Sequence, residues 1–128
     1  MVPVEKVGLE NKYAQEAQDA AGFSLCLKRK VAAVLAGGDL LCFGWNGPDK
    51  PVESCPSMES ETGEDYALCA ENCPSATHAE IDALNDAYFN LCEPKGMDLY
   101  LYGHDSVCPE CLVACERSGI KTIYIVEK

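Results

Sequence analysis

The chain has 128 residues, 48% of them hydrophobic, and we expect residues 1–128 to form a single domain around one core. Its formal net charge of −11 argues against a DNA or RNA polymer as partner, because proteins that follow a nucleic-acid backbone usually carry a basic surface. No segment approaches the roughly 20 apolar residues of a membrane span, and no apolar signal-peptide run is present. We therefore expect a cytoplasmic protein without a membrane partner.

Three elements are expected in the first third of the chain. Residues 8–22 are rich in helix formers, with small apolar residues at helical spacing, and predict an amphipathic helix. Residues 31–36 and 40–45 are short apolar runs on either side of a Gly-Gly-Asp turn, which predicts a β-hairpin.

Residues 46–76 differ in composition from the rest of the chain. They contain four of the seven prolines and three of the nine cysteines, without clear periodicity. A loop of this length in a small domain usually carries a function or a staple, and the cysteines could supply the staple.

Helices and strands alternate in the remaining part of the chain. We expect a helix over 77–91, a strand over 97–102, a helix over 109–118 that stops at Gly119, and a strand over 122–126. The core-facing stripe of the helix over 77–91 is expected to comprise Ile81, Leu84, Tyr88 and Leu91. This alternation predicts an α/β fold whose sheet has some parallel pairing.

Two motifs carry the candidate chemistry: His-Ala-Glu at 78–80 and Cys-Pro-Glu-Cys at 108–111. Each lies at the expected start of a helix, where the pKa of a thiol falls and the metal-binding thiolate is favoured. If the two helix starts face each other, His78, Cys108 and Cys111 can converge on one zinc ion. Because a closed structural site has four protein ligands, three ligands indicate a site with an open position for water.

The charge balance of the zinc site favours a role for Glu80 other than that of a metal ligand. Two thiolates already neutralise Zn²⁺, so Glu80 can instead take a proton from the water in the open position and pass it to a leaving group. Two alternatives do not involve catalysis. Thr77-x-x-Glu80 is also a capping box, which is compatible with a catalytic Glu80, and Cys108-x-x-Cys111 could be a redox pair or half of a structural zinc site.

Between about Ser24 and Val126 the chain resembles the zinc-dependent cytidine and deoxycytidylate deaminase superfamily, in particular the phage-type deoxycytidylate deaminases. Residues 78–81 and 108–111 match its two signatures, and the Gly-Trp-Asn-Gly sequence at 44–47 looks like part of its first hairpin. The resemblance implies a three-layer cytidine-deaminase-like α/β fold with a mixed sheet flanked by helices. It also implies that His78, Cys108 and Cys111 hold a catalytic Zn²⁺ and that Glu80 shuttles the proton.

The same resemblance suggests contacts with the substrate. Asn46 would hydrogen-bond the nucleotide sugar, and the Ala79 backbone would meet the pyrimidine edge. Arg29, in the basic cluster 28–30, is a candidate contact to the 5′-phosphate, with a solvated surface cluster as the alternative. His104 is a candidate contact to substrate or water, with an ordinary surface histidine as the alternative.

The remaining cysteines fall into two groups. Some phage-type relatives carry a second, structural zinc, and the resemblance suggests that four cysteines form such a closed site here: Cys26, Cys55, Cys69 and Cys73. The alternative is that these four are ordinary free cysteines. The other three lie in expected helices and strands and are predicted to be core residues: Cys42, Cys92 and Cys115.

The expected function is hydrolytic deamination of a deoxycytidine nucleotide, dCMP to dUMP plus ammonia, by a homo-oligomer such as the relatives form. A phage-encoded enzyme of this kind would act in the host cytoplasm. One alternative is a deaminase of another free nucleoside or base, which the motif at 44–47 disfavours. The other is an inactive, zinc-stabilised binding module, which the intact Glu80 disfavours.

Overall fold

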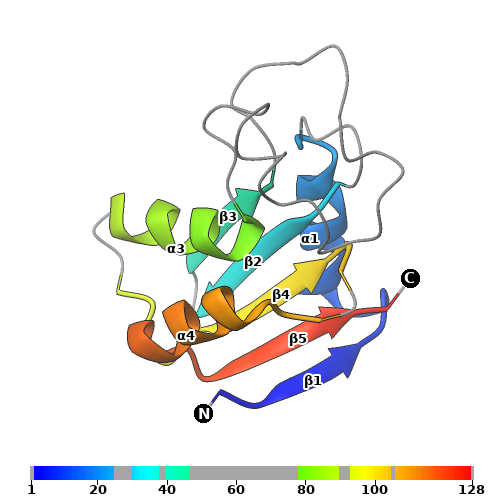
Figure 1. Cartoon of the computed structure of the whole chain (residues 1–128). Coiled ribbons are helices and arrows are strands. Elements are labelled where there is room, and N and C mark those ends of the chain that lie inside the picture. Colours follow the sequence, from blue (N-terminus) through cyan, green and yellow to red (C-terminus); the bar gives the residue numbers. More distant parts are fainter. Residues whose placement is uncertain are drawn as a thin grey trace.

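A five-stranded mixed sheet forms the centre of the structure, a computed structural model that describes residues 2–24, 30–37, 40–46, 78–89, 93–104 and 106–127 (Figure 1). The elements are β1 (Val4–Val7), α1 (Lys12–Ala21), β2 (Ala32–Gly37), β3 (Leu40–Trp45), α3 (Ala79–Phe89), β4 (Asp98–Tyr102), α4 (Pro109–Ser118) and β5 (Thr122–Val126). In the sheet the strands follow the order β1-β5-β4-β2-β3. The predicted strands and helices are therefore all present, within one or two residues at most ends.

The pairing of the strands explains why the sheet is mixed. β2 and β3 form the predicted antiparallel hairpin, and β2 also pairs antiparallel with β4. β4 and β5 are parallel because α4 carries the chain back between them. The predicted combination of hairpin and parallel crossover is confirmed.

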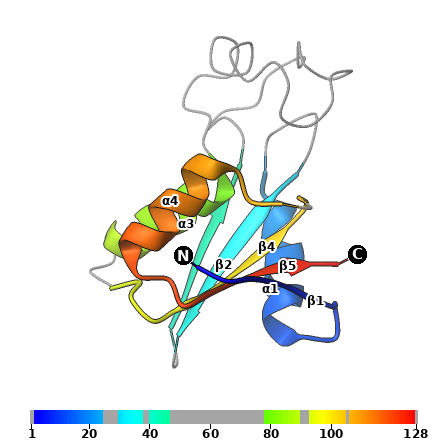
Figure 2. The ribbon, with the colours of Figure 1, turned by 60° about the horizontal axis from the view of Figure 1, so that its bottom comes forward.

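Helices cover both faces of the sheet and give three layers, as predicted. Figure 2 shows α3 and α4 side by side on one face and α1 on the other. Neighbouring residues of β2 point to opposite faces, so Leu35 packs in the core under α3 and α4 while Val34 packs with Ala14 and Ala17 of α1. Among the described residues, no helix is long and apolar enough to cross a membrane.

The N-terminal part of the chain differs from the prediction. Residues 8–11 are not helical, because the Asn11 side chain accepts hydrogen bonds from the backbone N–H groups of Tyr13 and Ala14 and so caps α1 at Lys12. The preceding residues form β1, an edge strand parallel to β5 that was not predicted from the sequence. β1 has only four residues and three of them are exposed, so it lacks a clear hydrophobic pattern.

The predicted core stripe of α3 is largely wrong. Leu84 is buried, but Ile81 is only half-buried and Tyr88 is 54% exposed. The face of α3 against the sheet is formed instead by small residues spaced four apart: Ala79, Ala83 and Ala87. Small side chains are required there because α3 lies very close to β3. Leu91 is outside the described residues.

Candidate metal centre

Two helix starts bring the predicted metal ligands together. α3 begins at Ala79, and the His78 carbonyl accepts the hydrogen bond from the Asp82 N–H. Cys108 caps α4: its Sγ accepts from the Cys111 N–H at 3.4 Å, and Pro109 follows at the first helical position, where no N–H is needed. The predicted cap Thr77 lies outside the described residues.

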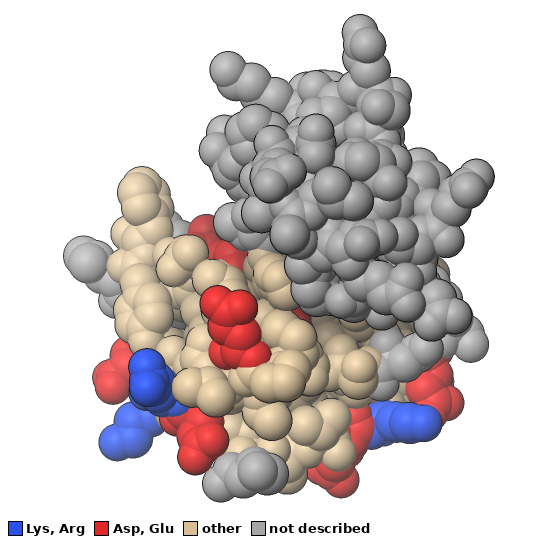
Figure 3. Space-filling model, viewed as in Figure 1, with Lys and Arg blue, Asp and Glu red and all other residues tan. Residues whose placement is uncertain are grey.

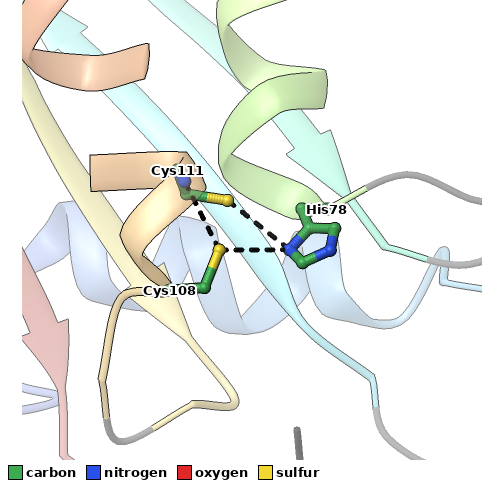
Figure 4. Close-up of side chains that lie close together, drawn as sticks. All are labelled: His78, Cys108 and Cys111. Atoms are coloured by element: carbon green, nitrogen blue, oxygen red, sulfur yellow. Dashed lines mark hydrogen bonds between the residues drawn. The ribbon is translucent and has the colours of Figure 1, made fainter. Parts of the chain in front are cut away.

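The three ligand atoms converge as predicted (Figure 4). The Sγ atoms of Cys108 and Cys111 each lie 3.5 Å from Nδ1 of His78, and all three atoms are within 4.8 Å of one another. Tetrahedral zinc with ordinary Zn–S and Zn–N bond lengths would place sulfur and nitrogen about 3.6 Å apart. The geometry therefore fits a zinc site, and among the described residues this group comprises three side chains.

The buried thiols of α4 differ in whether they belong to the three-residue group or to the core. The expected fall of the thiol pKa at a helix start is wrong for Cys111: burial raises its pKa, and the neighbouring Glu80 carboxylate raises it further. This site therefore needs a cation to hold a thiolate. Burial likewise raises the pKa of Cys115 to about 12, but this side chain points into the core and is not part of the three-residue group. The prediction that Cys42 and Cys115 are core residues is confirmed, and Cys92 is outside the described residues.

Glu80 lies beside the three ligand atoms without belonging to their group. Its side chain is 5% exposed and hydrogen-bonds with Cys111 and with its own backbone N–H. Burial raises the pKa of this carboxyl, while the two hydrogen bonds and His78 act in the opposite direction. A buried carboxyl with a raised pKa holds a proton more readily than a solvated one, which suits a group that accepts a proton and then returns it.

The junction between β3 and α3 positions this helix start. Gly44 packs directly on the first turn of α3: a methyl group there would lie 2.5 Å from the Ala79 carbonyl oxygen and 2.7 Å from the Asp82 carbonyl carbon. Asp82 accepts from the Trp45 N–H at 3.1 Å, and Asp86 accepts from the Phe43 N–H at 3.0 Å. The open edge of β3 is thus hydrogen-bonded to the helix that carries Glu80.

The predicted substrate contacts are distributed around this junction. Asn46 directly follows β3, and Ala79 is buried in the first turn of α3. His104 is half-buried in the connection between β4 and α4. Gly103, with φ of 101°, lets that connection pass directly against the Lys30 carbonyl at the entrance to β2. Several predicted residues lie outside the described residues: Arg29, Cys26, Cys55, Cys69 and Cys73.

The residues that hold the site in place were not predicted from the sequence. Asp82 and Asp86 were not identified, although two acidic residues four apart on a helix that packs on a strand are a signal for bonding to the strand edge. Ser24, which hydrogen-bonds Asn46, was not identified either, and it lies 22 residues away in the chain.

No protein-family model and no curated protein sequence matches the chain. Solved structures do match. The dCMP deaminase from the cyanophage S-TIM5 in apo form has 23% sequence identity and a TM-score of 0.64, over 91% of this chain and 82% of that one. The same enzyme in complex with dCMP and dUMP has 22% identity and a TM-score of 0.67, over 93% and 82%. The chain therefore has the cytidine-deaminase-like α/β fold that its sequence predicted.

Proposed function

We propose that the protein is a zinc-dependent hydrolase that deaminates a deoxycytidine nucleotide, converting dCMP and water to dUMP and ammonia. One observation carries this proposal: the ligand atoms of His78, Cys108 and Cys111 have the separations of a tetrahedral zinc site, with the buried Glu80 carboxyl beside them. Two further observations support the substrate. A solved enzyme of the same fold binds dCMP and dUMP, and the net charge of −11 suits a small substrate better than a nucleic-acid polymer.

His78, Cys108 and Cys111 would hold the zinc ion. Two thiolates and a neutral imidazole would balance the charge of Zn²⁺, and three protein ligands are the number typical of a catalytic zinc site. When bound, zinc supplies a Lewis acid that lowers the pKa of water toward neutrality.

Glu80 would move the protons. Its carboxylate takes one proton from the attacking water and delivers it to N3 of the cytosine ring as the water oxygen bonds to C4. It then takes the second proton from that oxygen and gives it to the amine, so the C4–N bond breaks and ammonia leaves. Burial of Glu80 supports this role, because a raised pKa lets one carboxyl serve as base and then as acid.

Four residues would bind the nucleotide. The Ala79 N–H lies in the first turn of α3, where an N–H has no partner within the helix and can meet an acceptor on the pyrimidine. Asn46 would hydrogen-bond the sugar, and Arg29 and His104 remain candidates for the phosphate and for substrate or water.

A homo-oligomer is also part of the proposal. The face over α3 and α4 is largely uncharged (Figure 3), and a groove between the two helices is lined by Ile81, Tyr88 and Val113. Glu110 and Arg117 line the same groove seven residues apart on α4. An antiparallel second copy would pair them reciprocally, so we expect an assembly above the mass of one chain in light scattering.

Two further parts of the proposal rest on the sequence. A second zinc ion would be held by Cys26, Cys55, Cys69 and Cys73, since Cys69 and Cys73 have the spacing of two ligands on one helical turn. The enzyme would act in the cytoplasm, where nucleotide pools are found.

Ammonia release tests the proposal directly. The zinc-loaded protein is supplied with dCMP, dCTP, deoxycytidine and cytidine, and the highest kcat/KM is expected for dCMP. A higher value for an unphosphorylated nucleoside would favour the alternative deaminase. Zinc binding without turnover of any of the four would favour the inactive binding module.

A further inference from the structure

The side-chain amide of Asn46 is held through its oxygen by two donors from distant parts of the chain. Ser24 Oγ lies 2.6 Å from Asn46 Oδ1 and 2.8 Å from the Asn46 carbonyl oxygen, so its hydroxyl can donate to either. The Val31 N–H donates to the same Oδ1 at 2.9 Å, and the Asn46 N–H donates to the Val31 carbonyl at 3.1 Å. Asn46 is therefore fixed in both backbone and side chain.

These partners determine which way the amide points. A backbone N–H can only donate, so a flipped amide would set its NH₂ group against the Val31 donor and lose that bond. Oδ1 must face Ser24 and Val31, and the Nδ2 donor is presented on the opposite side. The amide end, by which we mean Ser24, Val31 and Asn46, thus fixes the direction of one hydrogen-bond donor.

Ser24 is itself held in place. It is 1% exposed, and a hydroxyl buried this deeply needs a partner, which Asn46 provides. The Lys30 ammonium donates to the Ser24 carbonyl and so joins the residues on either side of 25–29. Because Lys30 holds its backbone and Asn46 its hydroxyl, Ser24 can restrain the Asn46 side chain that follows β3.

The amide end adjoins the candidate metal centre through the β3–α3 junction. Trp45, one residue before Asn46, donates its N–H to Asp82 in the first turn of α3, and Gly44 packs on the Ala79 carbonyl. The Asn46 donor is therefore kept at a constant position relative to the helix that carries Glu80.

We infer that Ser24 is a positioning residue that orients the Asn46 amide and thereby selects a ligand with an acceptor oxygen beside the reacting ring. This inference rests on the proposed function. In a 2′-deoxynucleoside 5′-monophosphate the one free sugar hydroxyl is at the 3′ position, so this is the group that the oriented amide would select.

The test compares kcat/KM for dCMP with that for 2′,3′-dideoxycytidine 5′-monophosphate. The ratio should fall to near one in Asn46→Ala. In Ser24→Ala it should fall by about fivefold, the factor for one ordinary hydrogen bond, through KM rather than kcat. Thr122→Val is the matched control: it removes a different buried hydroxyl, which lies on β5, and should keep the parent ratio. Ser24→Thr keeps the hydroxyl and should also keep it.

A second measurement separates this inference from the proposed function. The ¹⁵N order parameter of the Asn46 side-chain NH₂, assigned by its absence in Asn46→Ala, should fall in Ser24→Ala and not in Thr122→Val. If the parent protein deaminates neither nucleotide, the proposed function fails and the order parameter alone decides about Ser24. An active Ser24→Ala with the parent ratio, or an inactive protein whose amide stays ordered, would overturn the role of Ser24.

Discussion

The two ends of the candidate site are built in opposite ways. At the metal end, which comprises His78, Cys108, Cys111 and Glu80, chemically distinctive side chains from two helix starts converge on one point. At the amide end, Asn46 is an ordinary residue whose orientation comes from Ser24 and Val31. Under the proposed function the metal end should decide whether the reaction occurs, since its groups would act on the reacting atoms. The amide end should decide which ligand is accepted, since its groups only present a donor.

The largest expected effect is at the metal ligands. Cys108→Ser should remove the catalytic zinc and abolish deamination of every substrate. Cys115→Ser, which changes a buried thiol outside the ligand group, should keep the zinc. Zinc per chain, measured by mass spectrometry with activity in parallel, checks both variants. Full zinc content in Cys108→Ser would remove this residue from the ligand set.

Glu80 is expected to come next. Glu80→Gln should lower kcat by about 10²–10⁴-fold for all substrates, because the amide cannot carry a proton, while zinc content stays unchanged. Glu116→Gln is the matched control: this glutamate is also on a helix that starts at the site, but it is exposed and does not line the groove proposed to bind a second copy. Equal losses in the two variants would show that negative charge near the site matters, and not proton transfer by Glu80.

A substitution at the β3–α3 junction should lower activity by an intermediate factor, because this junction positions both the metal end and the amide end. In Gly44→Ala the new methyl group would overlap the backbone of α3, so the helix start must shift. A displacement of about 1 Å can cost on the order of 10² in rate. Gly22→Ala, whose methyl comes no nearer than 3.2 Å to the Asp19 carbonyl, is the control. Steady-state kinetics that leave kcat and KM unchanged in Gly44→Ala would argue against positioning by this junction.

Asp82 should affect stability more than chemistry. Asp82→Ala leaves the Trp45 N–H without its acceptor and should lower the free energy of unfolding by about 1–3 kcal/mol. Asp82→Asn keeps an acceptor oxygen and removes the repulsion with Asp86, so its cost should be smaller. Urea denaturation of the parent and both variants measures these differences.

The difference in stability between the parent and Asp82→Asn should change with pH in one direction. Burial, and secondarily Asp86, raises the pKa of Asp82 in the folded protein, while the Trp45 N–H opposes this. The folded state then holds the Asp82 proton more tightly than the unfolded state, whose pKa is about 3.9. The stability that this tighter proton binding contributes is fully present below the unfolded-state pKa. It is lost as the pH rises through the folded-state pKa. The parent should therefore lose stability relative to Asp82→Asn from about pH 4 upward.

Local patterns in the sequence were sufficient for most of the fold and for the metal end. The hairpin, the helix that ends before Gly119 and the last strand follow from turn residues, caps and periodicity, which depend on near neighbours in the chain. The convergence of His78, Cys108 and Cys111 was predictable because each motif marks a helix start and zinc chemistry requires few residue types.

Only the tertiary structure decided the packing of α3, the pairing of β1 and the partners of Asn46. Ala83 faces the sheet and Tyr88 faces outward because Gly44 lets the helix approach β3, which no pattern within the helix reveals. Ser24 and Asn46 are common residues, and their bond exists because α1 and β3 end at the same place in space. Hydrogen bonds between distant segments depend on where the chain returns, whereas caps and ligand motifs depend on residues within one helical turn.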